Sequence, residues 1–441
     1  MMPEMKDIQV VVMMGGVGSR LGSLVKEVPK PMLPVCGRPF FEYELGLLRA
    51  AGFKRFLFCT GYLSSEIEDH FKDGKDLGLS ISYQKDGVDQ NGAPLLLGTG
   101  GALRHAFDRL DEDFLLVYAD SFMDIDYREV VYRYFKGREK GALSLMTLLH
   151  NGGRFDRSNV IFRDGELKLY DKSSDDPDMD YIDYGVNMFS RSVLEARKDG
   201  ERFDLSEIQH KLSLEGKLSG LVVKRRFYEI GRPESYREFN EYAAQRFGKA
   251  NKAAFLDRDG VLNEIVFNED TEQLDSPLKP EQLRLLEGAG EAVRILKEEG
   301  YLVFVITNQP AAAKGKTGLG DLFDINKRLM ELIPGIDEIF VCLHHPVGNE
   351  RAFEKNLIKK CDCRKPGTGL IEQACLKYEI DRSKSFLAGD SFTDVECGKR
   401  AGLKTVFIGD FKCDVCARLN HDKPDVVAKS IKQAVEVIIN E

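Results

Sequence analysis

Short apolar runs alternate along this chain with longer segments in which apolar and polar residues recur at helical spacing. The runs that predict buried strands are IQVVVMM, RFLFCTG, FLLVYAD, YLVFVITN, SFLAGD and KTVFIGD. Between them, PFFEYELGLLRAAG and GAGEAVRILKEEG have the amphipathic pattern of surface helices. Strands that alternate with helices build parallel sheets from strand-helix-strand units, so the pattern predicts an α/β fold.

The alternation begins a second time near residue 250. An amphipathic segment that ends at Phe247 is followed by the short polar GKANK and then by a new buried strand, AAFLD. The chain of 441 residues is also longer than one core usually supports, since domains average roughly 150 residues. We therefore expect two domains, residues 1–247 and 252–441, with no low-complexity linker between them.

The composition of the chain argues against some classes of binding partner. The formal net charge is −9, whereas nucleic-acid-binding surfaces usually carry a basic excess. No apolar stretch approaches the roughly 18 residues of a membrane span, and the N-terminus reads as a strand that leads into glycines, not as a signal peptide. We therefore expect a cytoplasmic protein that acts on small molecules, binds neither nucleic acid nor membrane, and keeps its nine cysteines out of disulfides.

A glycine-rich loop follows the first predicted strand, in the segment GGVGSRLGSLVKEVPKPMLPVCGRP. Its glycines allow backbone amides to approach an anion closely, and two cations add fixed positive charge. The residues concerned are Gly15, Gly16, Gly18, Arg20 and Lys30. A dinucleotide-binding loop is the alternative, because the glycines also match that fingerprint loosely. The proline-rich continuation with a central lysine favours a loop that holds a triphosphate.

The first half of the chain resembles the sugar-1-phosphate nucleotidyltransferases over about residues 7–245. The motifs that carry the resemblance are GG-x-G-S-R-L, PKPMLPV, LGTGGAL, LLVYAD, LYDKS, YIDYGVNMFS and FYEIGRPESY. In such enzymes a sugar phosphate attacks the α-phosphorus of a nucleoside triphosphate and pyrophosphate leaves. The resemblance implies a Rossmann-like domain of the GT-A-like kind, and it leaves open whether the protein forms a homo-oligomer through this domain.

The same resemblance assigns roles to single residues. Arg20 and Lys30 would hold phosphates, Asp120 would bind Mg²⁺, and Lys172 would bind the phosphate of the sugar. The residues implied to line the nucleotide and sugar pockets are Gly15, Gly16, Gly18, Ser19, Gly98 and Gly185. In two places the chain departs from the family pattern: Ala119 stands where glycine usually precedes the metal-binding aspartate, and Glu229 stands where a second metal-binding aspartate is usual. Glutamate keeps the carboxylate and adds a methylene, so the resemblance implies that Glu229 is the second metal ligand with an altered geometry.

In the second half, FLDRDGVLNE places Asp257 and Asp259 just beyond a predicted buried strand. A carboxylate attacks phosphorus only where its charge and that of the phosphate are offset, so Mg²⁺ and a lysine are expected nearby. Thr307, Lys365 and Asp390 follow in that order in VFVITNQP, CRKPG and FLAGDS.

This order resembles the haloacid-dehalogenase-like (HAD-like) phosphatases, which implies a Rossmannoid domain. By resemblance Asp257 forms an aspartyl-phosphate, and Asp259 protonates the leaving group and then activates water. Thr307 and Lys365 would orient and neutralise the phosphoryl group. Asp390 would complete a Mg²⁺ site with Asp257 and the backbone carbonyl of Asp259, while Asp394 either assists there or serves only as an acid in the first turn of a helix.

Three cysteines and one histidine have the spacing of a closed zinc site: Cys342, His344, Cys361 and Cys363. Four protein ligands leave no position for water, which indicates a structural metal. His345 is the alternative histidine, and the CxxC at Cys413 and Cys416 has no convincing second pair. Among HAD-like phosphatases, this loop resembles the heptose-bisphosphate 7-phosphatases and the related histidinol-phosphate phosphatases, over about residues 251–435.

Together the two resemblances imply one pathway for a bisphosphorylated sugar. The C-terminal domain would remove the 7-phosphate of D-glycero-D-manno-heptose 1,7-bisphosphate, and the N-terminal domain would join the remaining 1-phosphate to a nucleotide from GTP. Mg²⁺ is expected in both domains and Zn²⁺ in the second. The alternatives are another sugar with ATP, CTP or dTTP, a histidinol-phosphate phosphatase, and an N-terminal half that has lost catalysis and regulates.

Overall fold

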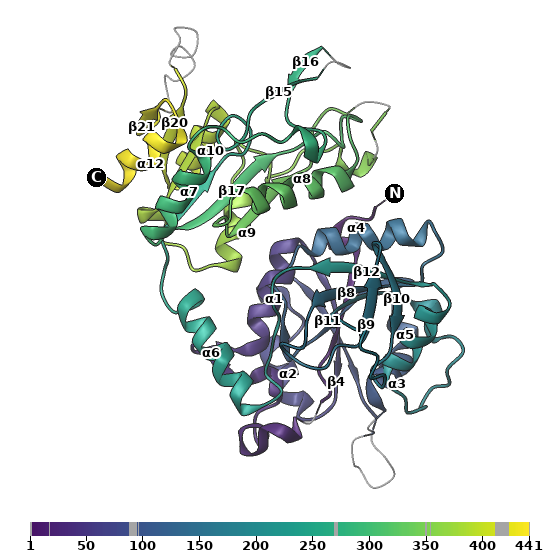
Figure 1. The fold of residues 1–441 in the computed structure, drawn as a ribbon. Coiled ribbons are helices and arrows are strands. Elements are labelled where there is room, and N and C mark those ends of the chain that lie inside the picture. Colours follow the sequence, from purple (N-terminus) through teal and green to yellow (C-terminus); the bar gives the residue numbers. More distant parts are fainter. Residues whose placement is uncertain are drawn as a thin grey trace. The chain divides into compact units, whose positions relative to one another are not determined.

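The computed structural model describes residues 2–16, 18–87, 95, 97–268, 272–348, 351–352, 354–410 and 423–440 (Figure 1). The chain divides into two compact units, Met2–Gln245 and Arg246–Glu441. The boundary expected at residues 247–252 lies just beyond this division. All six apolar runs predicted as strands are strands, and the two amphipathic segments are helices α1 and α7, as the α/β pattern predicts.

In the described part of the N-terminal unit, nine strands form one mixed sheet. They are β1 (Gln9–Met13), β4 (Arg55–Thr60), β5 (Ser80–Lys85), β6 (Asp113–Tyr118), β8 (Ser144–His150), β9 (Val160–Arg163), β10 (Glu166–Tyr170), β11 (Tyr181–Ser190) and β12 (Leu218–Val223). Strands β6, β1, β4 and β5 are adjacent and parallel. Their carboxyl ends therefore meet at one edge, where α/β sheets usually bind ligands.

The rest of this unit consists of two short ribbons and the covering helices. The ribbons pair β2 (Pro34–Val35) with β3 (Arg38–Pro39) and β7 (Ser121–Phe122) with β13 (Tyr228–Glu229). The α-helices are α1 (Phe40–Ala51), α2 (Ser64–Phe71), α3 (Gly98–His105), α4 (Tyr127–Arg138), α5 (Leu205–Leu214) and α6 (Pro233–Phe247). The 3₁₀ helices are η1 (Met5–Asp7), η2 (Ser19–Val25), η3 (Lys30–Met32), η4 (Lys75–Leu77), η5 (Phe107–Arg109) and η6 (Arg191–Leu194).

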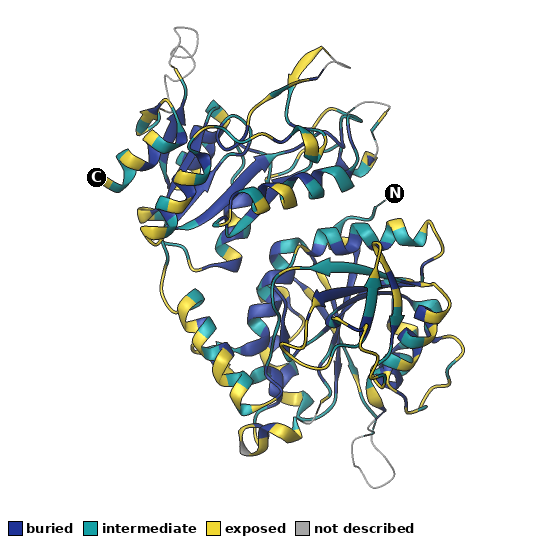
Figure 2. Ribbon diagram, in the orientation of Figure 1, coloured by how far each residue is buried: buried dark blue, intermediate teal, exposed yellow. Residues whose placement is uncertain are grey.

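Apolar burial joins elements that are far apart in the sequence. Leu103 of α3 and Leu205 of α5 pack in one cluster with Phe114 of β6. On α6, the buried ring of Phe239 packs edge-on against Phe40, with centroids 4.6 Å apart. The last helix of this unit is thereby fixed to its first half. Figure 2 shows the central strands of both sheets, such as β4 and β17, as mainly buried.

The C-terminal unit is built on a six-stranded sheet with the order β18-β17-β14-β19-β20-β21, in which all described strands are parallel. The strands are β14 (Ala253–Leu256), β17 (Leu302–Asn308), β18 (Glu338–Cys342), β19 (Phe386–Gly389), β20 (Lys404–Ile408) and β21 (Val426–Ala428). A separate hairpin pairs β15 (Val266–Asn268) with β16 (Gln273–Asp275).

Helices cover this parallel sheet. They are α7 (Ala289–Glu298), α8 (Leu319–Leu332), α9 (Gly369–Lys377), α10 (Phe392–Arg400) and α12 (Ile431–Asn440), with 3₁₀ turns η7 (Pro280–Gln282), η8 (Lys355–Leu357) and η9 (Arg382–Lys384). Leu370 of α9 and Cys397 of α10 share a buried cluster with Phe255 of the central strand β14. Among the described helices of the whole chain, none combines the length and the apolar composition that crossing a membrane requires.

Candidate active sites and metal centre

At the carboxyl edge of the N-terminal sheet, a short ribbon brings two predicted metal ligands together. Asp120 follows β6, and β7 then pairs with β13 so that Ser121 lies opposite Glu229. The backbone N–H of Ile230 donates to the carbonyl oxygen of Asp120 at 3.0 Å. The carboxylates of Asp120 and Glu229 therefore lie side by side, although they are far apart in the sequence.

Two cations from the glycine-rich segment lie against these carboxylates. The Nζ of Lys30 pairs with Asp120 and lies 3.9 Å from Oε1 of Glu229, while an Nη of Arg20 lies 3.7 Å from the same oxygen. Burial raises the pKa of Glu229, the neighbouring Asp120 adds to the rise, and Lys30 and Arg20 oppose it. Two acids and two cations thus form one charged cluster, whose carboxylate oxygens are the kind of ligand that Mg²⁺ takes.

The glycine loop lies at the same edge, directly after β1. Gly18 has a left-handed backbone, with φ of +62°, and Ser19 begins the 3₁₀ helix that carries Arg20. A Cβ atom on Gly16 would meet no described atom within 4 Å, whereas one on Gly15 would lie 2.8 Å from Oδ2 of Asp86. The loop is therefore open at Gly16 and closely packed at Gly15.

Gly98, predicted to line the nucleotide pocket, packs closely against another part of the chain. Its φ is +74°, and a Cβ atom there would lie 2.5 Å from the carbonyl oxygen of Phe203. The amides of Gly100 and Gly101 donate to that carbonyl at 3.1 and 3.2 Å. The glycines of LGTGGAL therefore hold the start of α3 against the segment that leads into α5.

Gly185 and Lys172 lie near a partly buried carboxylate, that of Asp183, which was not predicted from the sequence. Gly185 has φ of +99° within a register shift of β11, and its N–H donates to Oδ1 of Asp183 at 2.9 Å. Lys172 lies 3.7 Å from Oδ1 of Asp204. Burial raises the pKa of Asp183, while the hydrogen bond from Gly185 and the charge of Lys172 oppose the rise. The only signal for Asp183 in the sequence is its place two residues before Gly185.

In the C-terminal unit, Lys365 joins two carboxylates. Its Nζ lies 2.9 Å from Oδ1 of Asp257, which follows the central strand β14, and 2.5 Å from Oδ1 of Asp394 on α10. The same Nζ donates to the carbonyl oxygen of Ile306 at 2.9 Å. Only 3% of Lys365 is exposed, so its charge acts inside the site and not on the surface.

Asp390, after β19, completes a group of three carboxylates with Asp257 and Asp394. One oxygen of each lies within 4.8 Å of the others, an arrangement that fits a divalent cation. A Cβ atom on Gly260 would lie 2.1 Å from Oδ2 of Asp390, so glycine is required there. Asp394 also takes part in the capping box of α10, because its carboxylate accepts from the backbone N–H of Ser391, the N-cap residue. Its position is therefore compatible with both predicted roles, as an aid to the metal site and as an acid in the first turn of the helix.

Burial and mutual repulsion favour the neutral, protonated forms of the acids in this group. Burial raises the pKa of Asp257, Lys365 opposes the rise, and Asp394 adds to it. Burial and the neighbouring Asp394 also raise the pKa of Asp390, to about 6. Burial alone would lower the pKa of Lys365, but the two carboxylates beside it raise it above its ordinary value. A divalent cation would relieve the crowding of three acids around one base.

The side chain of Asp259 lies outside that group and is held by its own donors. Asn263, Ser276 and Gln309 donate to its carboxylate at 2.9, 2.9 and 2.5 Å, and the buried guanidinium of Arg258 pairs with it. Burial would raise the pKa of Asp259, but Arg258 and these hydrogen bonds outweigh it and lower the pKa.

Gln309 links that carboxylate to the strand end where Thr307 lies. Its Nε2, which donates to Asp259, also donates to the buried Oγ1 of Thr307 at 2.8 Å. Sequence reasoning missed all four partners of Asp259. Arg258, Asn263 and Gln309 stand within the quoted motifs, whereas nothing in the sequence points to Ser276.

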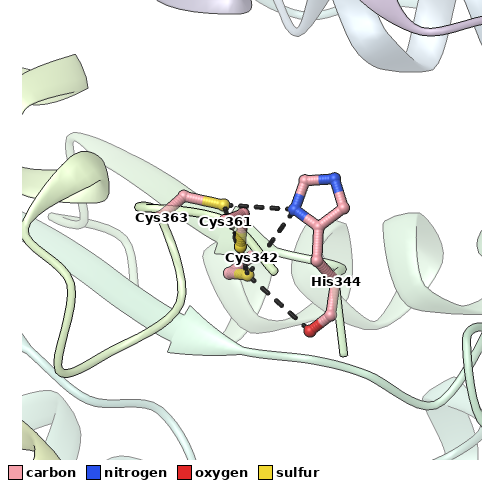
Figure 3. A group of neighbouring side chains, drawn as sticks. All are labelled: Cys342, His344, Cys361 and Cys363. Carbon is pink, nitrogen blue, oxygen red and sulfur yellow. Dashed lines mark hydrogen bonds between the residues drawn. The ribbon is translucent and has the colours of Figure 1, made fainter. Parts of the chain in front are cut away.

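The four predicted zinc ligands converge, as Figure 3 shows. The Sγ atoms of Cys342, Cys361 and Cys363 lie 3.3 to 3.6 Å apart, and Nδ1 of His344 lies 3.2 Å from Sγ of Cys363. These residues could hold one tetrahedral metal ion. The alternative, His345, instead has its Nδ1 accept from the backbone of Val347 at 3.2 Å, and Cys413 and Cys416 lie outside the described residues.

The loop that carries the cysteine and histidine cluster leads directly into the site around Lys365. Asn308, at the end of β17, holds both backbone groups of Lys365: its Oδ1 accepts from the N–H at 3.1 Å and its Nδ2 donates to the carbonyl at 3.2 Å. Arg364 donates to the carbonyl oxygen of His344 at 3.4 Å. The contact of Arg364 with His344 thereby joins the two ends of the loop, and the contacts of Lys365 with Asn308 join the loop to β17, the strand that carries Thr307.

Family models of known proteins match both units of the chain. The family model described as nucleotidyl transferase matches residues 9–246, and the model described as HAD-hydrolase-like matches residues 362–434. A D-glycero-D-manno-heptose-1,7-bisphosphate 7-phosphatase of Chlorobaculum tepidum is 34% identical over 195 residues, which are 42% of this chain and 92% of the relative.

Two further relatives match the N-terminal unit, and both are named D-glycero-alpha-D-manno-heptose 1-phosphate guanylyltransferase. The protein of Aneurinibacillus thermoaerophilus is 28% identical over 52% of this chain and 96% of its own length. The protein of Campylobacter jejuni is 25% identical over 53% of this chain and 98% of its own length.

Proposed function

The chain belongs to the nucleotidyl transferase family in its N-terminal half and to the HAD-like phosphatases in its C-terminal part, and on that premise we propose that it carries out two successive steps of nucleotide-sugar synthesis. The C-terminal unit hydrolyses the 7-phosphate of D-glycero-D-manno-heptose 1,7-bisphosphate. The N-terminal unit then transfers GMP from GTP to the α anomer of heptose 1-phosphate and releases pyrophosphate.

One observation carries this proposal: a single chain joins relatives of two enzymes whose names describe consecutive substrates. The relative of the C-terminal unit is named for removing the phosphate at position 7, and those of the N-terminal unit are named for the 1-phosphate that remains. A phosphatase fused to a 1-phosphate nucleotidyltransferase must spare the anomeric phosphate. Removal of the distal phosphate satisfies that constraint.

In the phosphatase unit, the residues around Lys365 supply a nucleophile and its charge balance. Asp257 attacks the phosphorus, and the bond to the sugar oxygen breaks as Asp259 gives that oxygen a proton. Because its donors lower the pKa of Asp259 in the free protein, this proton enters on the monoanion of the bound phosphate and passes through Asp259 to the sugar oxygen. Asp259 then removes a proton from the water that hydrolyses the aspartyl-phosphate. Thr307 and Lys365 orient and neutralise the phosphoryl oxygens. A Mg²⁺ ion held by Asp257, Asp390 and Asp394 would supply further neutralisation of negative charge.

In the transferase unit, catalysis rests on alignment and electrostatics. Arg20 and Lys30 neutralise the phosphates of the nucleotide. The glycine loop of the protein, which begins at Gly15, lies beside these phosphates. Asp120 and Glu229 would hold a Mg²⁺ ion that adds to this neutralisation. Lys172 binds the phosphate of the incoming sugar, and the open backbone at Gly16 allows close approach of the nucleotide.

We further propose that the Cys342 cluster binds a structural Zn²⁺ that holds Lys365 in place. Replacement of Cys363 by serine is expected to abolish stoichiometric zinc and to reduce phosphate release at least about tenfold, while pyrophosphate release is retained. The matched control is Cys375→Ser, because Cys375 is a partly buried thiol of the same unit outside the cluster. Metal analysis of the purified protein and the two product assays decide the outcome. Full phosphate release from zinc-free protein would contradict the proposal.

The proposed reactions are tested by one substrate panel. Purified full-length protein is expected to release phosphate from heptose 1,7-bisphosphate, and pyrophosphate from heptose 1-phosphate with GTP more readily than with ATP, CTP, UTP or dTTP. Histidinol phosphate serves as the competing phosphatase substrate. If no nucleoside triphosphate gives pyrophosphate, the transferase proposal fails, and a preference for histidinol phosphate overturns the phosphatase proposal.

A further inference from the structure

Ser276 lies beside the carboxylate of Asp259, although it belongs to none of the sequence motifs. Its Oγ donates to Oδ2 of Asp259 at 2.9 Å, from the segment that follows the hairpin of β15 and β16. In the proposed phosphatase reaction Asp259 gives a proton to the leaving sugar oxygen and later takes one from water. The contact of Ser276 with this carboxylate therefore bears directly on proton transfer.

The hydrogen-bond donors of Asp259 come from three segments of the unit. Arg258 and Asn263 belong to the loop after β14 that also carries Asp259, and both donate to Oδ1. Gln309, after β17, and Ser276, after β16, both donate to Oδ2, at 2.5 and 2.9 Å. These last two bonds tie the carboxylate directly to segments outside its own loop. They therefore fix the direction in which Oδ2 points relative to the rest of the site.

The segment that carries Ser276 is itself anchored, so the hydroxyl group has a defined position. Lys316 donates to both carboxylate oxygens of the neighbouring Asp275, at 2.7 and 2.6 Å, and the two side chains are only 19% and 18% exposed. Thr317 donates to the carbonyl oxygen of Leu278 at 3.0 Å. The chain on both sides of Ser276 is thus held to the segment between β17 and α8.

Proton transfer depends strongly on the alignment of the acid with the oxygen that receives the proton. Without the hydroxyl of Ser276, Oδ2 of Asp259 keeps donors from Gln309 and Arg258, so the carboxylate stays in the site. It is then free to turn towards these remaining donors. A poorly aligned acid slows departure of a group that needs a proton, whereas attack of Asp257 on phosphorus does not require it.

We propose that Ser276 is a positioning residue for Asp259, and that it acts by holding Oδ2 in the direction needed for proton transfer to the leaving sugar oxygen. This inference rests on the proposed phosphatase function and adds to it a residue from outside its sequence motifs.

The test uses two substrates that differ in their need for an acid. The sugar oxygen of heptose 1,7-bisphosphate leaves as an unstable alkoxide unless it is protonated. Acetyl phosphate is smaller than the heptose substrate, and it releases acetate, which is a stable anion. The ratio kcat/KM covers the steps up to release of this group. Ser276→Ala is expected to lower kcat/KM about tenfold with the bisphosphate and to stay within about twofold of wild type with acetyl phosphate.

The bisphosphate alone gives a second readout. In Ser276→Ala, kcat should fall about tenfold while KM stays within about twofold, and Ser276→Thr, which keeps a hydroxyl group, should restore kcat to within about threefold of wild type. The matched control is Ser383→Ala, because Oγ of Ser383 also donates to an aspartate of the same unit, Asp381, at 2.5 Å in an exposed turn. This control should keep wild-type values with both substrates.

The variant Asp259→Asn separates failure of this inference from failure of the proposed function. It should lose at least about 10²-fold in kcat/KM with the bisphosphate and less than about tenfold with acetyl phosphate. If wild-type protein releases no phosphate from the bisphosphate, or if Asp259→Asn loses both substrates equally, the proposed function or its acid fails and the inference fails with it. If Asp259→Asn shows the selective loss but Ser276→Ala keeps full activity or loses both substrates equally, the inference alone is overturned.

Discussion

Replacement of Asp257 by asparagine is expected to reduce phosphate release from heptose 1,7-bisphosphate by at least about 10³-fold, while pyrophosphate release stays within about twofold of wild type. The amide has the size of the carboxylate but cannot form an aspartyl-phosphate. It also removes one of the three oxygen ligands that fit a divalent cation. Lys365 remains in place, because Asp394 and the carbonyl of Ile306 still hold its Nζ.

The same substitution is expected to leave stability unchanged or to increase it. Burial raises the pKa of Asp257, so the folded protein disfavours its ionised form relative to the unfolded chain. For an acid with a raised pKa, this cost is present above the folded-state pKa and disappears as the pH falls. Asparagine carries no charge at any pH and therefore avoids the cost at neutral pH. A melting temperature measured in EDTA should be equal to or higher than that of wild-type protein.

The control for Asp257→Asn is Asp381→Asn, at an exposed turn of the same unit where Asp381 caps η9. Asparagine caps helices as well as aspartate does, so both activities should remain. Phosphate release by Asp257→Asn above about one-tenth of the wild-type rate would show that another group attacks the phosphorus. A clear loss of pyrophosphate release would show that the two units depend on each other.

The positions of candidate site residues could be predicted from the sequence where a functional group stands at the end of a strand. Asp120, Asp257 and Asp390 each follow a run of apolar residues, and the carboxyl ends of parallel strands bring such positions together. The grouping of the four residues predicted to bind zinc could also be predicted, because the C-x-H pair and the C-x-C pair lie on one loop. In both cases the spacing of the residues along the sequence is enough to predict that their side chains lie close together.

Contacts that depend on strand order could not be predicted from one sequence. Asp86 reaches Gly15 only because β5 lies beside β4 and β4 beside β1. Ser276 reaches Asp259 from the segment that follows a hairpin, and no motif marks it. Such contacts are set by tertiary packing, which a local pattern does not encode.

The role of a glycine was also harder to predict than its presence. The motif LGTGGAL implied that Gly98 lines a pocket, whereas the structure shows its close packing on the carbonyl of Phe203. Both roles require a residue without a side chain, and only the neighbours distinguish them. The pocket role of Gly98 therefore remains a prediction, while its packing role is observed.

Replacement of Asp120 by asparagine is expected to reduce pyrophosphate release by at least about 10³-fold and to leave phosphate release unchanged. The backbone of the residue is held by its carbonyl, which accepts from Ile230, so the ribbon of β7 and β13 should persist. The substitution removes the negative charge that pairs with Lys30 and that would bind the cation. With Asp120 neutral, Lys30 is left with the more distant Glu229 as its acidic partner in this cluster.

Comparison with Glu229→Gln makes this prediction specific. Glu229 lies 3.9 Å from Lys30 and its side chain is 43% exposed, so water can replace part of its interaction. We therefore expect a loss of about 10- to 10²-fold in pyrophosphate release for Glu229→Gln, smaller than for Asp120→Asn. Calorimetry with Mn²⁺ and GTP should show the same order in cation-dependent nucleotide binding. If both variants lose pyrophosphate release equally, the two carboxylates contribute equally as ligands and the expected ranking is wrong. If Asp120→Asn keeps more than about one-tenth of the wild-type activity, the cation site lies elsewhere.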